Sequence, residues 1–122
     1  MLIRNAFGLR TRLNSFLARR AFLSTLVRTD GPLVRRQEVI SIVDDNLSIR
    51  RAVKRLIESA ELVVEEFTSA EEFLLSSRSQ DSACLILDLR LPGMSGLELL
   101  QKLKESEPGV EVILLTAYLR WY

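Results

Sequence analysis

The sequence predicts an α/β fold in which a parallel sheet is covered by helices on both faces. Four short apolar segments alternate with three segments of helical periodicity, in the order β-α-β-α-β-α-β. The apolar segments are continuous rather than alternating, which is typical of strands buried in a parallel sheet. With 122 residues, the chain is long enough for one domain and too short for two ordinary ones.

The strands are expected where apolar and β-branched residues gather between turn signals. They span residues 39–43, 61–67, 83–88 and 110–115. The third of these ends on Asp88 and is followed by a turn that contains Pro92 and Gly93.

Three amphipathic segments predict the helices. The first, at about residues 48–60, has an apolar face formed by Ile49, Ala52, Val53, Leu56, Ile57 and Ala60. Its charged residues should face outward: Arg50, Arg51, Lys54, Arg55 and Glu58. Ser69 with Glu72 and Ser95 with Glu98 form capping-box patterns, which predict the starts of the other two helices. Residues 76–82 are polar and are expected to form a loop.

The net charge of +1 hides an asymmetry along the chain. Residues 1–36 contain eight arginines and one acid, whereas residues 37–122 contain nine basic and fifteen acidic side chains. We therefore divide the chain into a basic leader, 1–36, expected to be disordered, and a folded part, 37–122. An organellar transit peptide and a basic segment for anionic membranes or nucleic acid are the alternatives for the leader.

Composition restricts the kinds of site that the chain can form. No histidine is present, so the chain supplies no phosphohistidine, imidazole base or histidine metal ligand. The single cysteine, Cys84, cannot form an internal disulfide and suits a reducing cytoplasm. No apolar stretch reaches the roughly 18 residues of a membrane span.

Three of the expected strands end in polar groups that could form one site. Asp44 and Asp45 follow the first strand, Asp88 ends the third, and Thr116 follows the fourth. Ligands of parallel α/β sheets bind beyond the carboxyl ends of the strands, where these residues would meet. Each alone has a simpler explanation, because an aspartate there can cap the next helix and a threonine can belong to a turn.

Clustered carboxylates repel one another unless a cation neutralises them. Oxygen ligands favour Mg²⁺, which shares its coordination shell with water and phosphate. A carboxylate beside Mg²⁺ can attack a phosphoryl group, and the hydroxyl of Thr116 could donate to one of its oxygens. The sequence thus points to phosphoryl chemistry at one of these aspartates.

Three blocks of the sequence resemble the receiver domain of two-component response regulators. They are VISIVDD at 39–45, LILDLRLPGMSG at 85–96 and VILLTAY at 112–118, in the family's order and approximate spacing. The resemblance covers residues 38–122 and implies a flavodoxin-like fold with strand order 2-1-3-4-5.

The resemblance also implies a role for each site residue. Asp88 would accept a phosphoryl group from a phosphohistidine on a sensor histidine kinase or phosphotransfer protein. Asp44, Asp45, Asp88 and the backbone carbonyl of Arg90 would bind Mg²⁺. Thr116 would be the switch hydroxyl. The chain would be a cytoplasmic phosphoacceptor that phosphorylates itself from a donor rather than a turnover enzyme, and no DNA-binding domain is expected within residues 1–122.

The sequence departs from the family after the fourth strand. The resemblance implies a fifth strand, with a lysine that pairs with the phosphoryl group, and a last helix, none of which follows Tyr122. We therefore expect a receiver fold lacking the fifth strand and last helix, with the fourth strand as an unpaired edge and with low stability. Loss of the lysine's charge should weaken phosphoryl transfer.

Two further functions remain open at this stage. A module that binds a partner kinase without accepting phosphate would keep the helices and lose the chemistry. An aspartyl-phosphate phosphatase also places a nucleophilic aspartate after a strand, but it uses a second aspartate two residues later, where this chain has Arg90.

Overall fold

The computed structural model describes residues 2–3, six positions between 8 and 18, residues 38–106 and residues 109–115. The elements in chain order are β1 (Leu2–Ile3), β2 (Val39–Val43), α2 (Leu47–Glu58), β3 (Val63–Phe67), α3 (Ala70–Leu75), α4 (Arg78–Asp81), β4 (Cys84–Asp88), α5 (Gly96–Ser106) and β5 (Glu111–Leu115). Among these described residues, no helix has the length and apolar character needed to cross a bilayer.

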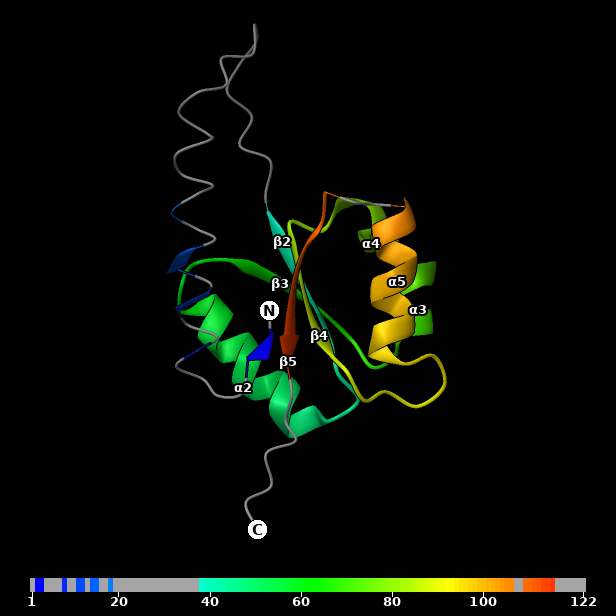
Figure 1. Cartoon of the computed structure of the whole chain (residues 1–122). Helices are drawn as coiled ribbons and strands as arrows, with labels where there is room; N and C mark the ends of the chain where they lie inside the picture. The colour runs from blue at the N-terminus through cyan, green and yellow to red at the C-terminus, as the bar shows by residue number, and fades with distance from the viewer. Residues whose placement is uncertain are drawn as a thin grey trace, which may run out of the picture.

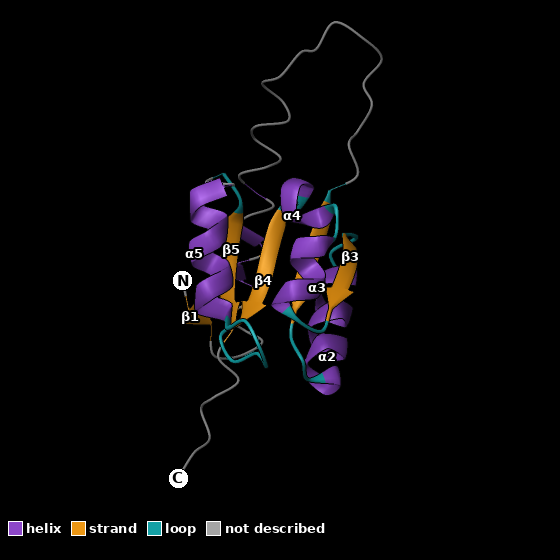
Figure 2. Ribbon diagram, turned by 90° about the vertical axis from the view of Figure 1, so that its right-hand side faces the viewer, coloured by secondary structure: helices purple, strands orange, loops and turns teal. Residues whose placement is uncertain are grey.

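The strands form one parallel sheet in the order β1-β5-β4-β2-β3. Helix α2 covers one face, and α3, α4 and α5 cover the other (Figure 1). The view turned by 90° shows these three helices in front of the strands (Figure 2). The predicted class, a parallel sheet covered on both faces, is confirmed. The order of β3, β2, β4 and β5 also agrees with the order expected for the first four receiver strands.

The core has two halves because successive strand residues point to opposite faces of the sheet. On the α2 face, Ile42, Ile86 and Ile113 pack with Val53 and Ile57 of the helix. All five side chains are at most 7% exposed. The apolar periodicity of the helix is therefore confirmed in its centre, although Ala52, which was expected on the buried face, is exposed.

On the opposite face, Leu85 and Leu87 of β4 pack against Phe73 of α3 and Leu99 of α5. All four are fully buried. Strand β4 thus contributes apolar side chains to both halves of the core, which explains why its sequence is continuously apolar.

The helices α3 and α5 begin where the capping-box patterns predict. The hydroxyl oxygen of Ser69 accepts a hydrogen bond from the Glu72 backbone N–H at 3.1 Å. Ser95 accepts one from the Glu98 N–H, also at 3.1 Å. Each bond satisfies a helix N-terminal donor that would otherwise lack a partner within the helix.

The expectation of a loop at 76–82 is wrong in part, because Arg78–Asp81 form the short helix α4. Buried Ser82 ends this turn, and its hydroxyl donates to the Arg78 carbonyl oxygen at 2.7 Å. The same hydroxyl lies in hydrogen-bond contact with Ser41 of β2. A four-residue helix held by such contacts leaves no periodicity in the sequence.

The expectation of an unpaired edge at the fourth strand is also wrong. Strand β1 pairs with β5 in parallel, with Leu2 opposite Leu114 and Ile3 opposite Leu115. The N-terminal residues therefore occupy the sheet position beside β5 where the family resemblance implied a fifth strand. Most of the leader lies outside the described residues, and the division near residue 37 stays a prediction.

Candidate functional site

The two central strands bring the predicted aspartates together. Strands β2 and β4 are neighbours, with Val43 opposite Leu87, and each strand leads directly into an aspartate. Asp44 follows β2, and its N–H donates to the Phe67 carbonyl of β3 at 3.1 Å. Asp88 is the last residue of β4.

Asp44, Asp45 and Asp88 form one carboxylate cluster. One oxygen from each lies within 4.8 Å of the other two. Asp44 is fully buried and Asp88 is 6% exposed, whereas Asp45 is exposed. The cluster therefore consists of two buried carboxylates, Asp44 and Asp88, and the exposed side chain of Asp45, which can change its orientation.

Local backbone turns orient the two buried carboxylates. Asp44 Oδ1 accepts the Asn46 N–H at 2.9 Å, and Asp88 Oδ1 accepts the Arg90 N–H at 3.0 Å. In both cases the aspartate accepts a hydrogen bond from the backbone N–H two residues later. This bond closes a turn that fixes the orientation of the side chain. Asp44 Oδ2 is buried, and no hydrogen-bond donor from the described part of the chain reaches it. When Asp44 is protonated, its side chain can instead share the proton with Asp88.

Burial raises the pKa of Asp44 to about 7, against the opposing hydrogen bond from the Asn46 N–H, and the negative charge of Asp88 raises it further. Burial raises the pKa of Asp88 as well, and the Arg90 N–H partly offsets this. The site is thus costly to ionise without a cation. A cation that enters should displace a proton.

The cluster fits a magnesium ion. Mg²⁺ binds oxygen ligands octahedrally at about 2.1 Å, so neighbouring ligands lie about 3.0 Å apart and opposite ligands about 4.2 Å apart. The carboxylate oxygens lie within 4.8 Å of one another, so they would have to approach by up to about 1.8 Å, and the exposed Asp45 side chain can move to provide part of this. The unpaired buried oxygen of Asp44 is then a ligand atom in need of a partner.

The loop between β4 and α5 is held from two sides. Gly93 has a φ of 72°, which explains why glycine occupies this turn. The next N–H, from Met94, donates to Glu71 Oε1 of α3 at 2.6 Å, and this bond lowers the pKa of Glu71. Gly96 approaches the Asp88 backbone too closely for any side chain, and its N–H donates to the Leu89 carbonyl at 3.2 Å.

Of the predicted site residues, the structure brings together the three aspartates. Arg90 lies beside Asp88 through its N–H, and the role of its carbonyl stays a prediction. Thr116 lies outside the described residues. Sequence reasoning missed Glu71 and Arg50. Arg50 was expected to face outward, yet only 11% of its side chain is exposed because it folds back onto the loop after β2.

The model of the response regulator receiver domain matches residues 40–120. The chain belongs to the response regulator receiver family. The transcriptional regulatory protein FixJ of Azorhizobium caulinodans is 37% identical to the receiver over 79 residues, which is 65% of this chain and 37% of FixJ. The chain thus spans little more than a third of that relative's length.

Solved structures with the same fold include TrrA of Thermotoga maritima in complex with Mg²⁺-BeF. Its TM-score is 0.63 at 32% identity, covering 67% of the receiver and 71% of the TrrA chain. TrrA in complex with the histidine kinase ThkA gives a TM-score of 0.61 at 31% identity, covering 69% of the receiver and 72% of that chain.

Proposed function

We propose that Asp88 accepts a phosphoryl group from a phosphohistidine on a partner protein. Asp44, Asp45, Asp88 and the Arg90 carbonyl would hold Mg²⁺, and Thr116 would be the switch hydroxyl. The observation that carries the proposal is the carboxylate cluster, in which no hydrogen-bond donor among the described residues reaches a fully buried oxygen of Asp44. An unpaired carboxylate oxygen beside two further carboxylates suits a cation site and is costly otherwise.

The proposed phosphoryl transfer moves the group directly from the donor imidazole to Asp88. A carboxylate oxygen of Asp88 attacks phosphorus, a P–O bond forms, and the P–N bond to the donor imidazole breaks. The bonding pair stays on nitrogen, which takes a proton from solvent. When bound, Mg²⁺ supplies positive charge that offsets the charge on the transferring phosphoryl oxygens. The Arg90 N–H holds the Asp88 side chain at the strand end.

The proposed donor is a sensor histidine kinase or a phosphotransfer protein. TrrA is related to this receiver and is found in complex with the histidine kinase ThkA, which supports a kinase partner. We place the receiver in the cytoplasm, where the thiol of its single, buried cysteine, Cys84, would stay reduced.

The proposal is tested by phosphate uptake on the full chain. Phosphoramidate, which has a P–N bond like that of phosphohistidine, and acetyl phosphate serve as small donors with millimolar Mg²⁺. We expect wild type to take up one phosphate that hydroxylamine releases, as it does from an acyl phosphate. Chelation of Mg²⁺ should abolish uptake.

Two variants locate the phosphate. Asp88→Asn should take up none, whereas Glu105→Gln, which changes an exposed acid on α5, should behave as wild type. Equal uptake by Asp88→Asn would overturn the phosphoacceptor assignment. No uptake by folded wild type from either donor would favour a module that binds a kinase without accepting phosphate.

A further inference from the structure

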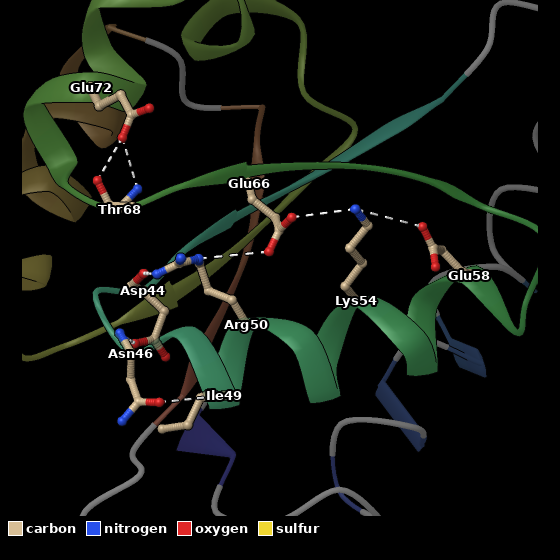
Figure 3. A network of polar contacts seen from close by, with 9 residues as sticks. All are labelled: Asp44, Asn46, Ile49, Arg50, Lys54, Glu58, Glu66, Thr68 and Glu72. Atoms are coloured by element: carbon tan, nitrogen blue, oxygen red, sulfur yellow. Dashed lines mark hydrogen bonds and ion pairs between the residues drawn. The ribbon is translucent and has the colours of Figure 1, made fainter.

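Arg50 reaches back from helix α2 to the end of strand β2. Its Nη1 atom donates a hydrogen bond to the Asp44 carbonyl oxygen at 2.8 Å (Figure 3). The side chain is 11% exposed, so it lies against the protein and not in solvent. The bond ends at the peptide group between Asp44 and Asp45, where the chain leaves the sheet.

The other side of the guanidinium faces a carboxylate on β3. Arg50 Nε lies 3.6 Å from Glu66 Oε1, an ion pair too long for a hydrogen bond. Glu66 is held in turn by Lys54, whose Nζ lies 3.3 Å from Oε2 and 4.0 Å from Glu58. Figure 3 shows this row of charges running along α2 from the site. Arg50 therefore joins α2, β3 and the loop after β2.

The peptide group that Arg50 binds controls two of the three carboxylates. It carries the carbonyl of Asp44 and the N–H of Asp45, so its rotation would turn the Asp45 side chain away from the cluster. The Asp44 N–H is fixed separately by Phe67 of β3. Among the described residues, Arg50 thus holds the Asp44 carbonyl through its hydrogen bond. It also places a positive charge close to the three carboxylates.

We propose that Arg50 is a positioning residue for the magnesium site: its bond to the Asp44 carbonyl aims Asp44 and Asp45 at a common point. This inference rests on the proposed function of the cluster. Arginine suits the task because its planar fork can donate to the carbonyl and face Glu66 at once, which a lysine ammonium cannot do in the same geometry.

The test measures Mg²⁺ affinity of the full chain by calorimetry, together with urea unfolding without Mg²⁺. Groups that orient metal ligands typically change metal affinity by about 10- to 100-fold when removed. We expect Arg50→Ala to weaken Mg²⁺ binding within that range and Arg50→Lys to lose about tenfold. Arg51→Ala, an exposed neighbour on the same helix, should bind as wild type.

The outcomes separate this inference from the proposed function. If Arg50→Ala lowers stability but binds Mg²⁺ as wild type does, Arg50 is merely structural and the inference is wrong. If Arg50→Ala fails to fold, Arg50→Lys decides: unchanged affinity overturns the inference. Asp44→Asn tests the site itself. If Asp44→Asn binds Mg²⁺ as tightly as wild type, or wild type binds none, the proposed site fails and the inference with it.

Discussion

Gly96→Ala is expected to destabilise the receiver even though alanine is the better helix former. Gly96 is the first residue of α5, and an added Cβ would lie 2.7 Å from the Leu89 Cα and 3.0 Å from the Asp88 carbonyl carbon. The Asp88 carbonyl oxygen would be closer still. All three are backbone atoms, so no side chain can turn aside to make room.

The expected magnitude follows from two opposing effects. Overpacking a tight site costs about 1–3 kcal/mol, and a contact with backbone belongs at the upper end. Replacing glycine by alanine in a helix gains at most about 1 kcal/mol. We therefore expect the free energy of unfolding to fall by about 2 kcal/mol, since the steric cost exceeds the propensity gain.

Urea unfolding followed by circular dichroism measures this change, and the chain provides a matched control. A Cβ added at Gly109 would meet no atom within 4 Å, so Gly109→Ala should leave stability almost unchanged. Relief of the contact at Gly96 also requires movement of the Asp88 backbone, so Mg²⁺ should stabilise Gly96→Ala less than wild type. A Gly96→Ala protein as stable as wild type would refute the steric reasoning.

Two further predictions concern ionisation and packing. Without Mg²⁺, the free energy of unfolding should fall as pH rises from about 4 to about 7, because the pKa of Asp44 is about 7 in the folded protein against an ordinary 3.8, so the folded state holds the extra proton in that window. Asp44 alone contributes a fall of about 4 kcal/mol, since each of about three pKa units corresponds to about 1.4 kcal/mol, and the raised pKa of Asp88 acts in the same direction. A flat profile in urea titrations with chelator, or one that Asp44→Asn does not make less steep, would contradict this prediction. Phe73→Ala should cost about 4 kcal/mol, because Phe73 is fully buried with its ring 5.3 Å from that of Phe67. Leu75→Ala, at a position 90% exposed on the same helix, should stay within about 0.5 kcal/mol of wild type, and similar losses for the two would show that the Phe73 side of α3 does not form the core.

Local patterns predicted most of the fold because each one reflects a local cause. Strand β2 occupies the predicted residues 39–43, since four of its five buried positions carry β-branched apolar residues and only Ser41 is polar. The starts of α3 and α5 were readable from Ser69 and Ser95, whose capping bonds span only three residues. The three aspartates were predicted to meet because the carboxyl ends of neighbouring parallel strands share one edge.

The features that the sequence did not predict depend on contacts between distant segments. The helical periodicity places Arg50 among the charges that face outward. Its contact with the Asp44 carbonyl depends on the path of the backbone after β2, which the sequence pattern does not reveal. Glu71 likewise contacts Met94, 23 residues away, through a backbone N–H that carries no sequence signature. Strand β1 is only two residues long, which is too short for a repeating apolar pattern to show in the sequence.

The pairing of β1 with β5 has a consequence for the order in which the sheet assembles and opens. It joins Leu2 to Leu114, so nearly the whole chain must be in place before the two strands can meet. Closing so long a loop costs entropy that two residue pairs repay only in part. We expect this edge to form last in folding and to open first in the native protein, so that amide hydrogens shared by β1 and β5 exchange with solvent well before those between β2 and β4.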